Sequence, residues 1–339
     1  MNKIKLIFLL IISFVLINII IVILWPIKTN LKHSDYNYYS DKFLKSLELN
    51  KTEGRKLYLE TWQRERLFEF DEYTGLRESE LLNGTYVNIT KENGRLVPDN
   101  RKQCQQNVFF YGGEIVFGYD VTDRQTIPSF FSNLLKINNK KNCVYNFGRK
   151  TYFSTQENIL FQKHILNNKI NKNDIIVFIN GTNEQGNKTL INTEFIETNY
   201  NNLHQKYWKL YKAGIKYFLD LLPITQFIQI LNNKLETKGI NSNIEESKKL
   251  NNEVEIFNVY NKNLKIRKAI CKQYNLRCFN FLLIESEKDR YNKIYEKFKA
   301  IDEVLDLNET LTLKLNEQGS LYPESNKKIS EKIYRNIFN

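Results

Sequence analysis

Histidine is scarce in this chain of 339 residues, and its distribution limits the chemistry available. The three histidines are His33, His164 and His204. None follows residue 204, so the last third of the chain cannot supply an imidazole as a general base. His164 and His204 lie on predicted helices, and no neighbouring residues indicate catalytic geometry. We interpret His164 as a surface or packing residue.

Arginine-rich blocks and known nucleic-acid modules are also absent. The net charge is +12, but the lysines are spread along the chain together with abundant Asn and Ile. This pattern is typical of a biased base composition rather than of a nucleic-acid footprint, so we expect no nucleic-acid partner. No internal repeat of about 20–50 residues is present, which excludes a solenoid or propeller.

The amino terminus predicts a membrane anchor. Lys3 and Lys5 precede an uncharged run from Leu6 to Ile27, which is long enough to cross ~30 Å of hydrocarbon. A cleaved signal peptide is the alternative, but residues 24–28 lack the small-x-small pattern of a cleavage site. We therefore expect residues 1–30 to form a cytoplasmic tip and an uncleaved anchor. The main domain would then be periplasmic or extracellular.

The four cysteines fit export. Cys104 precedes a predicted strand and Cys143 opens the next one, so adjacent parallel strands would bring the two within bridging distance. Cys271 and Cys278 flank a short helix-to-strand connection and form a second candidate pair. Four buried thiols in a reducing compartment are the alternative, and the predicted anchor favours disulfides.

The rest of the chain divides by pattern into two parts. Residues 31–100 are polar and aromatic, which predicts a stalk and a lead-in segment with a strand at 85–90 and a turn at 91–95. Residues 101–339 alternate strands with helices, which predicts an α/β domain with a doubly wound parallel sheet flanked by helices. The expected strands are 107–112, 143–147, 174–180 and 278–284, and the expected helices are 127–137, 154–168, 194–213, 245–275 and 323–337.

One stretch of this domain has the form of a catalytic motif. The apolar run Phe109–Tyr111 leads into Gly112 and Gly113, as a buried strand leads into a tight turn before a helix. The residue after such a turn is lifted to the top of the sheet, where reactive side chains are often displayed. In this chain that residue is Glu114.

Four blocks of sequence, taken in order, resemble the SGNH/GDSL-like hydrolases of the membrane-anchored, envelope-associated type. The similarity covers about residues 80–337 and implies an SGNH/flavodoxin-like three-layer sandwich. The blocks are Tyr111-Gly112-Gly113-Glu114 with Thr126-Ile127-Pro128-Ser129, then Tyr145-Asn146-Phe147-Gly148 with Ser154, Gln156 and Glu157, then Asn180-Gly181-Thr182-Asn183-Glu184, and Ser320-Leu321-Tyr322-Pro323-Glu324.

The resemblance also identifies the positions that carry hydrolysis in that family. Its chemistry needs a hydroxyl nucleophile, a histidine base, a carboxylate that orients the base, and oxyanion donors. By this resemblance Glu114 replaces the serine, Thr151 an oxyanion glycine, Glu317 the aspartate and Ser320 the histidine. Asn183 alone keeps the residue type of the family, as an oxyanion donor.

These replacements favour a noncatalytic protein. We expect a membrane-anchored, exported SGNH hydrolase-like protein without a cofactor, which binds an envelope glycan or an assembly partner. A divergent esterase or acyltransferase acting on acylated surface polysaccharide is the alternative, and a structural envelope protein is a third interpretation. Glu114 and Glu317 could form an acid/base pair for glycosides, but no sugar-site motif accompanies them. Without a His or Cys pair nearby, they are also poor metal ligands.

Overall fold

The computed structural model describes thirteen stretches of the chain, which belong almost entirely to one of two compact units. That unit comprises residues 37–189 and 249–339. The anchor predicted at 6–27 and the helix predicted at 194–213 lie outside the described residues. Among the residues described, no helix is long and apolar enough to cross a membrane. The described residues are 39–62, 68–71, 74–78, 83–90, 94–98, 100, 104–150, 152–181, 184, 245–284, 293–308, 313–316 and 319–339.

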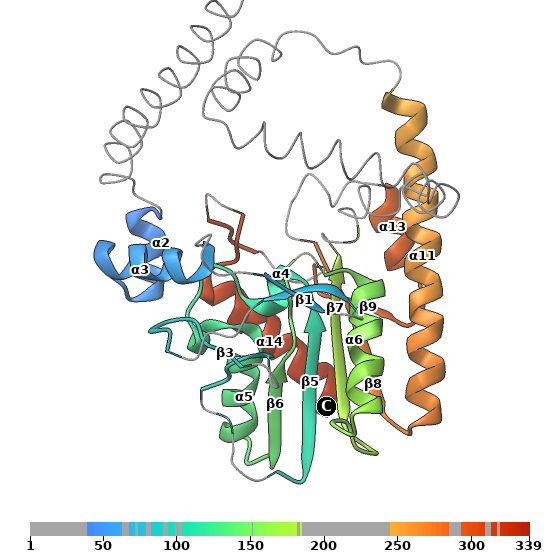
Figure 1. The fold of residues 1–339 in the computed structure, drawn as a ribbon, viewed down its shortest axis with the longest axis horizontal. Coiled ribbons are helices and arrows are strands. Elements are labelled where there is room, and N and C mark those ends of the chain that lie inside the picture. The colour runs from blue at the N-terminus through green and yellow to red at the C-terminus, as the bar shows by residue number, and fades with distance from the viewer. Residues whose placement is uncertain are drawn as a thin grey trace, which may run out of the picture. The chain divides into compact units, whose positions relative to one another are not determined.

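Seven strands of the described chain form the central sheet in the order β3-β4-β6-β5-β7-β8-β9 (Figure 1). Neighbouring strands are parallel throughout, except that β3 and β4 are antiparallel. The predicted α/β sheet is confirmed, with the correction that this edge pair makes it mixed rather than purely parallel. The strands are β3 (Ile89–Thr90), β4 (Gly94–Arg95), β5 (Gln106–Gly112), β6 (Asn142–Asn146), β7 (Ile175–Gly181), β8 (Arg277–Leu283) and β9 (Val304–Asp306).

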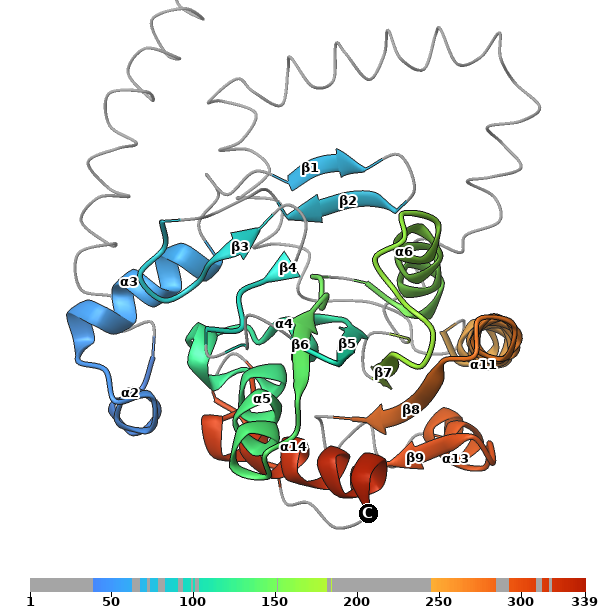
Figure 2. The same cartoon turned by 90° about the horizontal axis from the view of Figure 1, so that it is seen from below.

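Helices cover both faces of this sheet (Figure 2). Helices α5 (Ile127–Ile137) and α14 (Pro323–Phe338) cover one face, and α6 (Ser154–Leu166) and α11 (Glu245–Gln273) cover the other. Thr126 caps α5, because its hydroxyl accepts the Ser129 N–H at 3.2 Å. The result is the three-layer sandwich that the sequence predicted.

The packing on both faces of β5 explains its apolar run from Val108 to Tyr111. Val108 and Phe110 contribute to the apolar cluster beneath α5 and α14. Phe109 and Tyr111 point to the opposite face, where they join a cluster that includes side chains of α6 and α11. Because successive residues of a strand face opposite sides, a sheet covered on both faces buries every one of them.

Helices α2 (Asp41–Leu47) and α3 (Lys51–Trp62) pack on the same unit. Phe43 is fully buried, and its ring meets that of Tyr322 edge-on at 4.9 Å between centroids. Together with Leu57 and Phe117, these rings belong to a third apolar cluster. The lead-in segment is thereby joined to the start of α14.

The region just before the sheet differs from its sequence prediction. A strand was expected at 85–90, but β3 contains only Ile89 and Thr90. The backbone N–H groups of residues 85–87 donate instead to the Glu60 carboxylate at 2.8–3.0 Å, and that of Asn88 donates to Asp123. The turn expected at 91–95 also overlaps β4, since Gly94 and Arg95 pair with β3. Sequence analysis missed α13 (Lys293–Lys299) and β9.

Both expected cysteine pairs lie at disulfide distance. The Cα atoms of Cys104 and Cys143 are 5.5 Å apart, and those of Cys271 and Cys278 are 6.2 Å apart. The first pair is adjacent because β5 and β6 are parallel neighbours, with Asn107 opposite Cys143. The second joins the end of α11 to β8.

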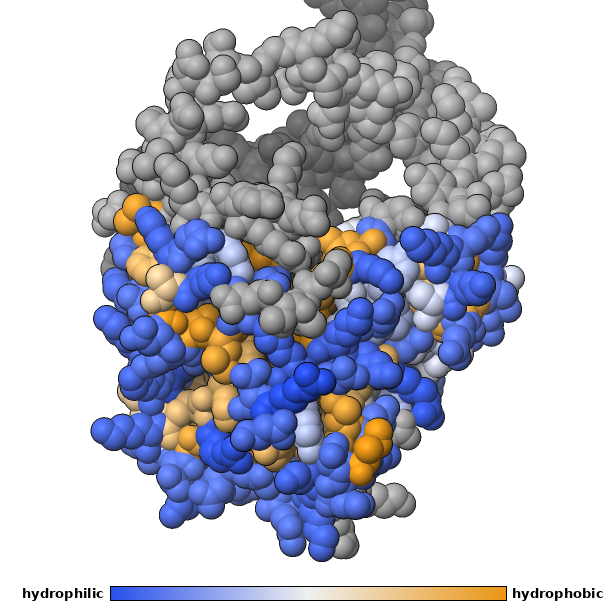
Figure 3. Space-filling view, turned by 180° about the vertical axis from the view of Figure 1, so that it is seen from behind, coloured by the Kyte–Doolittle hydropathy of each residue, from blue (hydrophilic) through white to orange (hydrophobic). Residues whose placement is uncertain are grey.

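The face of the molecule drawn in Figure 3 is mostly hydrophilic, and apolar side chains appear on it in small groups. The large apolar side chains with the greatest exposure among the described residues are Ile137 at 76% and Leu166 at 73%. They are the last residues of α5 and α6. Because these helices start near the carboxyl ends of the strands, both side chains lie towards the opposite end of the sheet.

Candidate functional site

The strand order places the candidate site at the carboxyl ends of β5 and β7. From β5 the chain moves to β6 on one side, and then to β7, β8 and β9 on the other. This is the flavodoxin-like order, and ligands of such sheets bind outside the carboxyl ends of the strands where the order reverses. Glu114 follows β5 closely, and Asn183 and Glu184 follow β7.

The turn after β5 presents Glu114 as the first residue of α4 (Glu114–Phe117). A Cβ atom on Gly112 would overlap Val116 and would lie 2.7 Å from the carbonyl oxygen of Ile179, so the turn requires glycine at this position. Gly113 is the N-cap residue and contributes no capping side chain. Glu114 itself is half-buried. The turn predicted from the sequence is therefore present, with a carboxylate at its displayed position.

The loop after β6 fixes α4 from one side. The Asn146 amide donates to the carbonyl oxygen of Val116 at 2.8 Å, and its own oxygen accepts the Gly148 N–H at 3.0 Å. The Arg149 N–H donates to Gly112 at 3.0 Å, which ties this loop to the end of β5. Thr151 follows on the same loop but lies outside the described residues.

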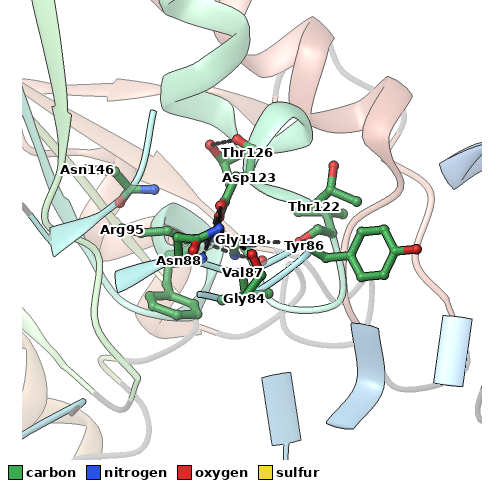
Figure 4. Close-up of polar contacts among 12 residues, drawn as sticks. Gly84, Tyr86, Val87, Asn88, Arg95, Gly118, Thr122, Asp123, Thr126 and Asn146 are labelled. Atoms are coloured by element: carbon green, nitrogen blue, oxygen red, sulfur yellow. Dashed lines mark hydrogen bonds and ion pairs between the residues drawn. The ribbon is translucent and has the colours of Figure 1, made fainter. Parts of the chain in front are cut away.

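Arg95 and Asp123 support the carboxyl-terminal end of α4. The buried guanidinium of Arg95 donates to Asp123 at 2.9 Å, to the carbonyl oxygen of Phe117 at 2.8 Å and to that of Val121 at 2.6 Å. It thus satisfies carbonyl groups at the end of the helix and just beyond it. Figure 4 shows Arg95 and Asn88 converging on the Asp123 carboxylate. These contacts join the end of α4 to the residue before β3, which gives the ion pair a structural role.

Ser320, at the position of the family histidine, is held by a carboxylate. Its hydroxyl donates to Asp120 at 2.7 Å, and the other oxygen of Asp120 accepts the Tyr39 hydroxyl at 2.5 Å. Asp120 is fully buried and has φ +60°, a left-handed conformation that Asp tolerates better than most residues. The contact therefore joins the terminal block to the loop after α4 and to the lead-in segment. Glu317 lies outside the described residues.

His164, the histidine within the described residues, is a buried packing residue. Its Nδ1 lies 2.7 Å from the Tyr111 hydroxyl, and its ring packs against Phe147 at 4.2 Å between centroids. Burial, assisted by the nearby charges of Lys169 and Arg149, lowers the pKa of His164 to about 3. The imidazole is neutral at physiological pH, and its Nδ1 is occupied by the tyrosine.

Of the five site positions taken from the sequence, the structure describes Glu114 and Ser320, and both are held in the region of α4. Asp120 was not predicted from the sequence, although it lies between the two parts of the first motif block, Tyr111–Glu114 and Thr126–Ser129. Among the described residues, no group of three or more His, Cys, Asp or Glu side chains is placed to hold a metal ion. The described part of the site therefore offers carboxylates and hydroxyls as its functional groups.

No protein-family model and no curated protein matches the sequence. Similar solved structures include lipolytic proteins of the G-D-S-L family from Desulfitobacterium hafniense, at 11% identity and a TM-score of 0.39, and from Veillonella parvula, at 13% and 0.30. The alignments cover 68% and 69% of this chain and 99% and 98% of those chains. An acetylxylan esterase from Geobacillus stearothermophilus, at 13% identity and a TM-score of 0.28, is covered over 96% of its length and 70% of this chain. The first two are named for the G-D-S-L family that the sequence motifs resemble, and at these values the likeness carries no argument about function.

Proposed function

We propose that this chain is an exported, membrane-anchored SGNH-like protein that does not hydrolyse esters and binds a glycan or an assembly partner at the cell envelope. The observation that carries the proposal is Glu114 at the displayed position after β5. A carboxylate there cannot supply the hydroxyl oxygen on which this family's acyl transfer depends.

Two further features support the absence of hydrolysis. The Ser320 hydroxyl is engaged by Asp120. His164, in turn, is buried against Tyr111 with a strongly lowered pKa. Without a nucleophile and a base, oxyanion donors alone provide only a small part of the acceleration.

Hydrolysis of p-nitrophenyl acetate by the intact protein in detergent tests this proposal. We expect no turnover above that of buffer, and no change in the Glu114→Ala and Asn183→Ala variants. Turnover that is lost in either variant would contradict the proposal and favour the divergent esterase or acyltransferase.

The binding role needs a separate measurement. Immobilised bacterial envelope polysaccharides, each in a native and a de-O-acetylated form, provide the probes for the intact protein. We expect saturable retention that weakens in the Glu114→Arg variant. Retention should be unchanged in the Glu296→Arg variant, because Glu296 is an exposed residue of α13. Equal retention of both variants would place binding away from the candidate site.

A further inference from the structure

Glu184 connects the chain after β7 to the start of α6. Its carboxylate oxygens accept the backbone N–H of Ser154 at 2.7 Å and the Ser154 hydroxyl at 2.8 Å. Ser154 is the first residue of α6, and the N-cap residue Phe153 offers no capping side chain. A helix start has unpaired N–H groups that need an acceptor. Glu184 supplies that acceptor from a different part of the chain.

Among the residues that the structure describes, the surroundings of Glu184 contain a second buried carboxyl group and one buried cation. Glu157 on α6 accepts from Arg267 on α11 at 2.9 Å and from the Asn180 amide at 2.7 Å. Arg267 is fully buried, and it also donates to Asn180 at 2.6 Å. The guanidinium charge is therefore committed to Glu157, and the hydrogen bonds of Glu184 come from Ser154.

Among the described residues, the charges of this cluster balance only when one proton is bound. Within that part of the chain, two buried carboxyl groups, Glu157 and Glu184, face the guanidinium of Arg267. Tyr260 on α11 is a further titratable group nearby, and burial raises its pKa so that it stays neutral. An uncompensated charge inside a protein is costly, so the site favours keeping one carboxyl protonated.

We propose that Glu184 is a proton-dependent lock, which holds the end of β7 against the start of α6 and releases this joint when its carboxyl ionises. The joint is close in sequence to two positions of the candidate site, because Asn183 directly precedes Glu184 and Thr151 shortly precedes Ser154. The proposal goes beyond the proposed function and is independent of it, since it concerns a contact between two elements of the fold.

The direction of the effect follows from linkage. Burial, and next the charge of Glu157, raise the pKa of Glu184 from 4.5 to about 7, against the opposing effect of Ser154 and Arg267. The closed joint therefore binds more protons than the open one between these pH values. Its stability is complete below pH 4.5 and is lost progressively as the pH rises through about 7.

Hydrogen exchange at the amide of residue 154 in the intact protein tests the proposal. After correction for the intrinsic rate, we expect its protection to fall about thirtyfold between about pH 5.5 and about pH 8.5, the change that linkage gives for these pKa values. Glu184→Gln keeps an acceptor and a donor but cannot ionise, so its protection should not change with pH. The matched control Glu296→Gln, on the exposed surface of α13, should retain the full fall.

Protection that is flat with pH in the unaltered protein, or the same fall in Glu184→Gln, would overturn the proposal. If Glu184→Gln does not fold, Ser154→Ala gives a second test. It removes one donor to the ionised carboxyl, which raises the pKa of Glu184 further. The midpoint of the transition should then move to higher pH, and an unmoved midpoint would equally refute the lock.

Discussion

Glu114 and Glu184 follow two neighbouring parallel strands, yet they occupy very different environments. Glu114 opens the short helix α4 and is half-buried. Glu184 is completely buried, and its carboxylate caps a different helix, α6. At the same edge of one sheet, the same residue type is thus half-buried at a helix start in one place and a fully buried helix cap in the other. Burial and available donors decide the role of a motif position, and its place in the motif does not.

Of the changes that test this contrast, replacing Arg267, the cation near Glu184, should lower the free energy of unfolding most. Arg267→Leu leaves the Glu157 carboxylate buried without its partner, and breaking a buried pair in this way costs about 3–5 kcal/mol. Denaturant unfolding of the intact protein measures the loss. The exposed control Arg335→Ala should stay within about 0.5 kcal/mol of the unaltered protein. A small loss for Arg267→Leu would mean that the polar network contributes little.

The two glutamates themselves provide a matched pair. Glu184→Ala removes the cap of α6 and leaves the buried Ser154 donors unpaired, which should cost about 1–3 kcal/mol. Glu114→Ala changes a residue that is only half-buried, so water replaces part of what is lost and the cost should be smaller. Unfolding of both variants at about pH 6 tests the difference. Equal losses would contradict the contrast between a half-buried and a fully buried carboxyl group.

A smaller effect is expected where the lead-in segment meets the site. Tyr39→Phe removes the hydroxyl that donates to Asp120 and should cost about 1 kcal/mol. Denaturant unfolding of the intact protein measures this loss. If Tyr39→Phe is as stable as the unaltered protein, the Tyr39–Asp120 contact does not hold the lead-in segment to the fold.

Periodicity made most of the fold predictable. The helix expected at 127–137 has those bounds, and the strand expected at 174–180 is shifted by one residue. Both signals are local, because an apolar run or an amphipathic stretch needs no knowledge of distant residues. The short elements α13 and β9 give no such signal, and the edge strand β3 was overestimated because the Glu60 side chain takes the N–H groups before it.

The candidate site was predictable only in part. The turn at Glu114 follows from a strand and two glycines, all of which are adjacent in sequence. The Asp120 contact with Ser320 joins residues 200 positions apart, and that of Arg267 with Glu157 joins residues 110 apart. No local sequence pattern predicts which distant residues will contact each other, although Glu157 and Glu184 both lie inside the motif blocks. Their burial, which determines their chemistry, emerges only when the layers assemble.

Ester hydrolysis by the Glu114→Ser variant tests the central claim most directly, because it restores the family's nucleophile and changes nothing else. On the proposed function we expect a folded variant without turnover of p-nitrophenyl acetate, because the Ser320 hydroxyl does not act as a general base in place of a histidine. Adding Glu317→Asp and Ser320→His would then supply the remaining family residues, and hydrolysis by that triple variant alone would agree with the account. Turnover by Glu114→Ser alone would show that a working base is already present, and would contradict it.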